Sequence, residues 1–110
     1  MIQYLSDFPN LTTEESFTAI MGTVPLSKTD FLAYMAKKLR FPSYFGGNWD
    51  ALQDCLSDLS WLEKKKITLI FPVVPLVDEK EMSLFLEIAE ESQRNLSHAG
   101  VELTVIVIKP

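Results

Sequence analysis

Two runs of apolar, largely β-branched residues constrain the fold of this chain most. Residues 67–74 (ITLIFPVV) and 103–108 (LTVIVI) are almost entirely apolar. Such runs are typical of strands buried on both faces, as in a parallel sheet, and Pro72 limits the paired length of the first. Between the two runs, Asp78 with Glu81 three residues on forms a capping-box-like helix start. Apolar residues then recur at helical spacing, at Met82, Phe85, Leu86, Ala89 and Leu96. A strand, a helix and a second strand in this order predict parallel strands joined by a helical crossover.

The residues before this unit predict one more strand and two more helices. Residues 17–21 (FTAIM) form a short apolar run that favours a strand. Ser27 or Thr29 can cap a helix that Pro42 stops, and Asn48 can cap a second helix that runs to about Leu59 or Trp61. The predicted order over residues 17–110 is strand, helix, helix, strand, helix, strand, in a single α/β domain. We interpret residues 1–16 as an N-terminal extension or an added edge element.

The overall charge excludes some partners. The chain has 10 basic and 15 acidic residues, a net charge of −5 and a pI of about 4.8. Nucleic-acid binders need basic surfaces to neutralise phosphate, so we expect no direct contact with nucleic acid. An acidic protein suits a basic protein partner, although many proteins of no such function are mildly acidic.

Other features of the sequence bear on the compartment. The single Cys55 allows no intrachain disulfide, which fits a reducing environment. The start of the chain lacks the basic and apolar regions of a signal peptide, and no window approaches the about 20 apolar residues of a membrane span. We therefore expect a soluble, cytoplasmic protein without membrane association.

The central stretch 41–61 (FPSYFGGNWDALQDCLSDLSW) carries a row of acids. At helical periodicity, Asp50, Asp54 and Asp58 fall on one face, opposite an apolar face that contains Cys55. Like charges four residues apart are mildly destabilising, and only Asp50 is placed to gain from the helix dipole. A solvated face is the ordinary explanation of such a row. Because the row costs local stability, we interpret it as a binding face.

The loop before this helix adds aromatic side chains to the same region. Tyr44 and Phe45 precede the pair Gly46-Gly47. Tyrosine is favoured in interfaces because it offers a large, stiff and amphipathic contact area. We expect Tyr44 to be displayed beside the acids and Phe45 to pack into the core.

Nothing in the sequence indicates catalysis or a cofactor. His98 is the only histidine and stands near a helix end, and Cys55 lies among leucines as a buried thiol would. The chain has no glycine-rich phosphate-binding motif. Three Asp on one helix could hold a hard cation only weakly, since no loop of backbone carbonyls supports them. We predict that the protein is not an enzyme and binds no metal or cofactor.

The stretch 41–61 resembles the signature of the barstar family, the intracellular protein inhibitors of secreted bacterial ribonucleases. The proline, the aromatic pair, and the Gly-x-Asn, Asp-Ala-Leu and Asp-Cys-Leu segments run in register without a gap. The resemblance implies a small three-stranded parallel sheet packed with helices, with the loop and the following helix plugging a ribonuclease active site.

The resemblance also implies which residues touch the partner. Family contact residues match Tyr44, Gly46, Asn48, Asp50 and Asp54. Asp54 falls on the acid that occupies the site of the substrate phosphate. Trp49 and Gln53 fall on interface positions where the best-known member has other residues. The family also uses an acid late in the next helix, but this chain has Asn95 there and Glu91 one turn earlier, so that contact is not carried over.

We therefore predict a ribonuclease inhibitor that acts as an immunity protein against a ribonuclease toxin. The alternative is a barstar-like acidic adaptor that binds a basic protein other than a ribonuclease. The substituted positions Trp49 and Gln53 keep that alternative open. An acid-using hydrolase is a third and more distant interpretation.

Overall fold

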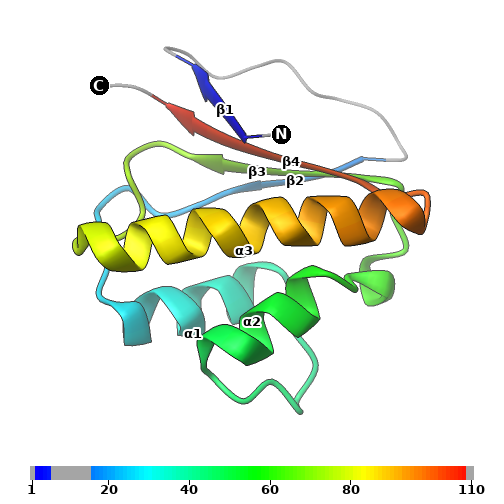
Figure 1. The fold of residues 1–110 in the computed structure, drawn as a ribbon, viewed down its shortest axis with the longest axis horizontal. Coiled ribbons are helices and arrows are strands. Elements are labelled where there is room, and N and C mark those ends of the chain that lie inside the picture. The colour runs from blue at the N-terminus through cyan, green and yellow to red at the C-terminus, as the bar shows by residue number, and fades with distance from the viewer. Residues whose placement is uncertain (1, 6–15, 109–110) are drawn as a thin grey trace.

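The computed structural model describes residues 2–5 and 16–108, and its elements follow the predicted order (Figure 1). From the second strand onward the order strand, helix, helix, strand, helix, strand is confirmed. The elements are β1 (Ile2–Leu5), β2 (Ser16–Ile20), α1 (Lys28–Lys38), α2 (Trp49–Leu56), the short 3-10 helix η1 (Ser60–Leu62), β3 (Lys66–Phe71), α3 (Glu79–His98) and β4 (Glu102–Ile108).

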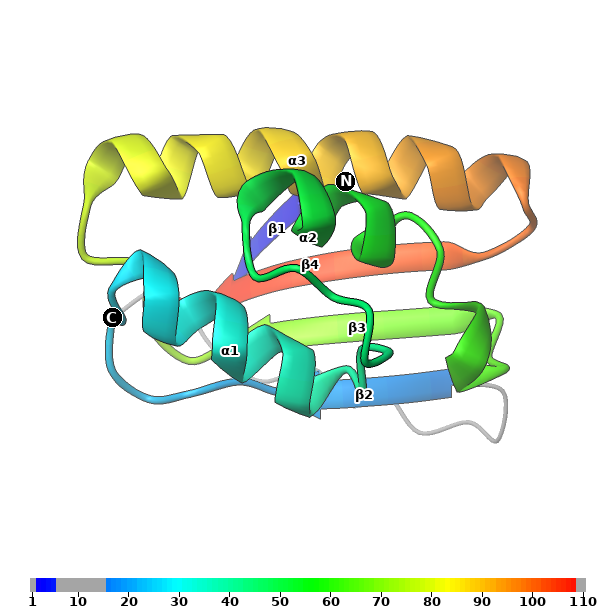
Figure 2. The same cartoon turned by 90° about the horizontal axis from the view of Figure 1, so that it is seen from below.

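All the strands run parallel in one sheet, with the order β1-β4-β3-β2. The chain steps from β2 to β3 and from β3 to β4, so both crossovers move in the same direction across the sheet. Right-handed crossovers that move in one direction place their helices on the same face. Figures 1 and 2 show α1, α2 and α3 together on one side of the sheet.

The predicted strands β2, β3 and β4 form the expected parallel sheet, and β1 adds a fourth strand at its edge. β1 pairs with β4 from Ile2 opposite Val105 to Leu5 opposite Ile108. The sequence left residues 1–16 open between an extension and an added edge element, and residues 2–5 of this segment form an edge strand. Of the predicted segment 1–16, residues 1 and 6–15 lie outside the described residues, and Ser16 is the first residue of β2.

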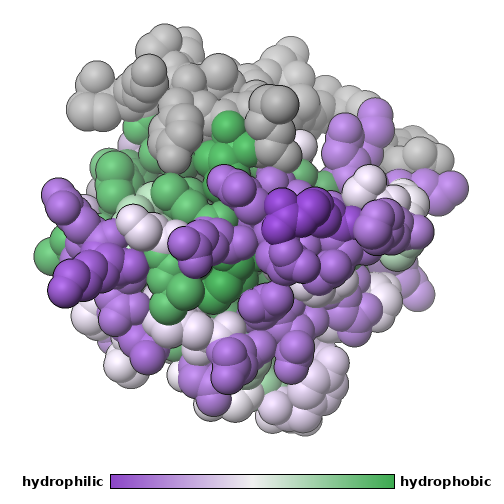
Figure 3. Space-filling view, viewed as in Figure 1, coloured by the Kyte–Doolittle hydropathy of each residue, from purple (hydrophilic) through white to green (hydrophobic). Residues whose placement is uncertain are grey.

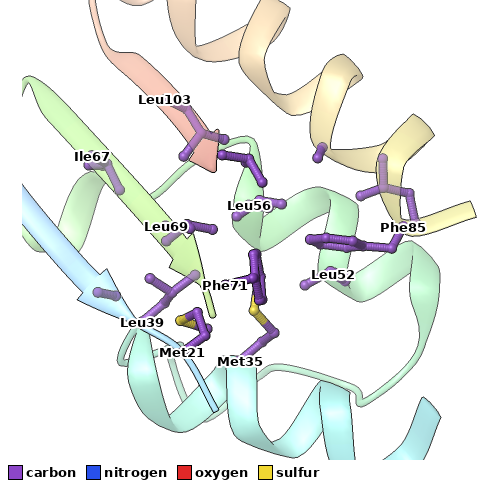
Figure 4. Close-up of a cluster of buried hydrophobic side chains, with 14 of the residues drawn as sticks. Met21, Met35, Leu39, Leu52, Leu56, Ile67, Leu69, Phe71, Phe85 and Leu103 are labelled. Carbon is purple, nitrogen blue, oxygen red and sulfur yellow. The ribbon is translucent and has the colours of Figure 1, made fainter. Parts of the chain in front are cut away.

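The core lies between the sheet and the helices. Ile67, Leu69 and Phe71 of β3 point into it, and Thr68 and Ile70 on the other face are buried as well. The prediction that this strand is buried on both faces is therefore confirmed. In Figure 4 the side chains of β3, α2 and α3 converge, among them Leu69, Leu52 and Phe85.

Each of the α-helices α1, α2 and α3 begins at a side-chain cap that satisfies a free backbone N–H group. Ser27 Oγ accepts a hydrogen bond from Asp30 N at 3.3 Å, and Asn48 Oδ1 accepts one from Ala51 N at 2.7 Å. Asp78 Oδ1 accepts hydrogen bonds from the amides of residues 80 and 81 at 2.8 and 3.2 Å. The predicted helix starts at Asn48 and Asp78 are thereby confirmed, and Ser27 is the cap of α1.

The predicted length of the second helix is wrong, because α2 ends at Leu56. Ser57 is its C-cap, and Leu59 then takes a left-handed conformation with φ 50° while its side chain is buried. Asp58 Oδ1 accepts a hydrogen bond from Ser60 N at 3.3 Å, the kind of local bond that competes with a helix. Asp58 therefore lies outside α2, and the row of helical acids comprises Asp50 and Asp54 alone.

Candidate functional site

The loop between α1 and α2 is built on aromatic packing. Phe41 meets the rings of Phe45 and Trp61 edge-on, at centroid distances of 4.9 and 5.9 Å. Trp61 Nε1 donates a hydrogen bond to Leu39 O at 2.8 Å, and Phe45 N donates one to Pro42 O at 3.0 Å. These contacts hold the base of the loop against the core.

The tip displays Tyr44 and turns Phe45 inward, as the sequence predicts. The Tyr44 side chain is 69% exposed, while Phe45 packs against the core cluster. Loss of hydration, followed by electrostatic interactions with Cys55, Asp58 and Asp54, raises the pKa of the Tyr44 phenol. The phenol therefore lies within electrostatic reach of both Asp54 and Asp58.

Glycine and asparagine form the turn that leads into α2. Gly47 has φ +72°, a left-handed conformation that glycine adopts without strain. A Cβ on Gly46 would lie 3.8 Å from both Ala51 Cβ and Asn48 Nδ2, so this glycine sits close against the start of the helix. The backbone at the turn is consequently exposed beside the Asn48 cap.

Asp50 and Asp54 project from the exposed side of α2, one helical turn apart. Within the described part of the chain, neither carboxylate takes part in an ion pair. Gln53 lies between them and is half-buried. We call the following set the acidic surface: Tyr44, Gly46, Asn48, Asp50, Gln53 and Asp54.

Trp49 differs from the other predicted contact residues because it points into the protein. Its side chain is half-buried and packs against the core cluster. Its indole Nε1 donates a hydrogen bond to Glu81 Oε2 of α3 at 2.7 Å. The sequence favoured a capping role for Glu81, three residues after Asp78, and gave no signal for this bond between helices.

Cys55 is buried in α2, and His98 is the last residue of α3. Burial, followed by the negative charges of Asp54 and Asp58, raises the pKa of the Cys55 thiol. His98 is exposed at the end of α3. Among residues 2–5 and 16–108, no three acidic, histidine or cysteine side chains gather as a metal site would require. No helix in the same ranges is long and apolar enough to cross a membrane.

The late part of α3 faces the end of α2. Asn95 Nδ2 donates a hydrogen bond to Ser57 Oγ at 3.1 Å, and Ser57 Oγ donates one to Ser92 Oγ at 3.1 Å. One turn before Asn95, Glu91 forms an ion pair with Arg94. In Figure 3, hydrophilic residues predominate over the C-terminal part of α3, whereas hydrophobic residues are visible around its N-terminal part.

Comparison with known families identifies the family of this chain. The family model Barstar, described as barnase inhibitor, matches residues 15–108. The chain belongs to the barstar family. The match spans β2 to β4 and includes the whole acidic surface. None of the curated proteins compared with the chain matches it.

The Asn48 cap of this barstar-family chain contributes stability that can be measured. Replacing Asn48 by alanine removes the acceptor for Ala51 N, and we expect the free energy of unfolding to fall by about 1 kcal/mol. Urea denaturation followed by far-UV circular dichroism measures this change. Asn48→Asp, which keeps a cap acceptor, should remain close to the wild type. An unchanged midpoint for Asn48→Ala would show that the cap contributes nothing.

Proposed function

We propose that this chain inhibits a ribonuclease by covering its active site with the acidic surface. The family match carries the proposal, since the family is described by its inhibition of barnase. The two exposed carboxylates of Asp50 and Asp54, which have no ion-pair partner within the described residues, support it. Inhibition would be steric and electrostatic and would require no catalysis.

The chemistry of a ribonuclease active site suits such an occupant. These sites gather cationic side chains to hold the phosphates of RNA, and a carboxylate can take the place of a phosphate through charge-assisted hydrogen bonds. In this proposal Asp54 anchors the contact, while Asp50 and Asn48 lie beside it. Tyr44 at the loop tip would pack at the rim of the contact, where its exposed ring can bury area against the partner.

The biological role we propose is immunity. A cell that makes a ribonuclease toxin, or receives one by contact, needs an inhibitor in its own cytoplasm. A strongly acidic surface would speed the encounter with a basic toxin. The toxin itself would be a small basic ribonuclease.

Inhibition of RNA cleavage tests the proposal. We expect the protein to stop cleavage of a fluorogenic RNA by barnase, or by ribonuclease toxins from the same source, at near-equal molar amounts. The association rate constant should fall as salt rises, because salt screens long-range attraction. An unrelated acidic protein at the same concentration is the control.

Failure to bind any of these ribonucleases would overturn the proposal. Recovery of a different basic protein in a pull-down with the acidic surface intact, and its loss with Asp54→Ala, would then favour the adaptor alternative. RNA cleavage by the purified protein alone would instead favour a hydrolase.

A further inference from the structure

Side-chain hydrogen bonds join α2 to α3 at both of its ends. At the first turn, Trp49 Nε1 donates to Glu81 Oε2 at 2.7 Å. At the last turn, Ser57 bonds to Ser92 and Asn95, each at 3.1 Å. Figure 1 shows α2 lying below α3 along this seam. Hydrogen bonds therefore join α2, the helix that carries Asp50 and Asp54, to α3 at two points.

Trp49, in the first turn of α2, also contacts α1. The Trp49 ring lies 6.1 Å from the ring of Phe31, and Lys28 Nζ lies 5.9 Å from the Trp49 ring centroid. Phe31 is buried, and both residues belong to the first turn of α1. One side chain of α2 thus contacts the first turns of both other helices, and Glu81 is its hydrogen-bond acceptor.

α2 depends on such contacts because it is too short to be stable as an isolated helix. It has eight residues, and isolated helices shorter than about 12–15 residues are marginal in water. Its two acids stand one turn apart and repel each other mildly. Tertiary contacts must therefore set where its first turn lies, and Trp49 is flanked directly by Asn48 and Asp50 of the acidic surface.

We propose that Glu81 is a positioning residue for the acidic surface. By accepting the Trp49 hydrogen bond, it holds the first turn of α2 so that Asn48, Asp50 and Asp54 are already in place when a partner arrives. Trp49 then acts from beneath the surface, although its position in the sequence indicates direct contact. Preorganisation of this kind strengthens binding because less ordering remains to be done on association. The effect on affinity rests on the proposed function, whereas the effect on α2 does not.

Hydrogen exchange in the free protein tests the positioning directly. The amides of Ala51 and Leu52 donate to Asn48 Oδ1 and O, at 2.7 and 2.9 Å, and so report on the first turn of α2. We expect Glu81→Ala and Trp49→Phe each to raise exchange at these amides about tenfold. The amide of Leu59, which donates to Cys55 O at 3.1 Å beyond the other end of the helix, should change little.

Two further variants separate positioning from charge and from general loss of stability. The double variant Glu81→Ala/Trp49→Phe should exchange no faster than either single variant, because both remove the same bond. Glu81→Gln should stay near the wild type, since its amide oxygen can still accept. Equal increases at Ala51, Leu52 and Leu59, additive effects, or no change at the first two amides would overturn the proposal.

The dissociation rate of the barnase complex tests the consequence for binding. We expect Glu81→Ala and Trp49→Phe to raise it about tenfold, and Glu81→Gln to leave it nearly unchanged. Glu79→Ala, which removes an exposed charge from the same turn of α3, is the matched control and should also change it little. If the wild type does not bind barnase, inhibition of that enzyme fails, and the exchange measurements alone decide whether Glu81 positions α2.

Discussion

Replacing Asp54 by alanine is expected to weaken inhibition of barnase at least about a hundredfold. Asp54 is exposed, has no ion-pair partner in the described chain, and belongs with Tyr44 to the acidic surface. In the complex, the alanine variant would leave the cationic side chains of the ribonuclease active site buried without a counter-charge. The expected size is that of buried charge pairs at protein interfaces in general, for which the barnase complex is itself the standard example. The inhibition constant from RNA cleavage measures it.

Two matched variants make the result specific to the position of the charge. Asp58→Ala removes the same side chain four residues later, outside α2, and should weaken inhibition much less. Glu102→Ala removes an exposed charge at the start of β4 and should affect only the salt-dependent association rate, slightly. Equal losses for all three variants would mean that net charge, and not an anchor at Asp54, drives binding. Urea denaturation should show that all three variants remain folded.

Replacing Phe85 by alanine is expected to lower the free energy of unfolding by about 3–5 kcal/mol. Phe85 of α3 is fully buried and meets the rings of Phe31 and Phe71 edge-on, at centroid distances of 4.9 and 5.6 Å. Its removal would open a cavity between the sheet and two helices that rigid neighbours cannot fill. Because small domains are stable by only about 5–15 kcal/mol, the variant would lose a large part of its stability. Urea denaturation measures the loss.

A series at the same position gives the control. Phe85→Leu keeps most of the apolar volume, so its cost should be clearly smaller. Val77→Ala shortens a side chain that is 69% exposed and should lie within about 0.5 kcal/mol of the wild type. A loss below about 1.5 kcal/mol for Phe85→Ala would contradict the central place of this ring in the core.

The sequence predicted the elements whose signals are local. The run 67–74 indicated a buried strand, and β3 is buried from Ile67 to Phe71, just before Pro72. Asn48 and Asp78 predicted two helix starts, because a capping side chain bonds to an amide only two or three residues away. Tyr44 is exposed and Phe45 packs against the core, as expected, because a phenol can form hydrogen bonds with water and a phenyl ring cannot.

Features that depend on contacts far apart in the chain could not be predicted in this way. Helical periodicity extended the row of acids to Asp58, but α2 ends at Leu56, and the buried Leu59 takes a left-handed conformation. The bond between Trp49 and Glu81 joins residues 32 positions apart. Glu81 stands three residues after Asp78, as a capping pattern requires, and nothing in the sequence indicates its hydrogen bond with Trp49.

The pairing of β1 with β4 bears on how the protein avoids aggregation. β4 carries LTVIVI, a segment with high β-propensity and no charge, of the kind that pairs readily with other chains when it lies at an open sheet edge. β1 occupies that edge from residue 105 to residue 108. Because this pairing joins residues distant in the chain, its loop-closure cost favours its formation late in folding, on a β4 already docked against β3. The short first strand would thus act mainly as a cover, and the interval before it docks is when newly made molecules are most exposed to association with one another.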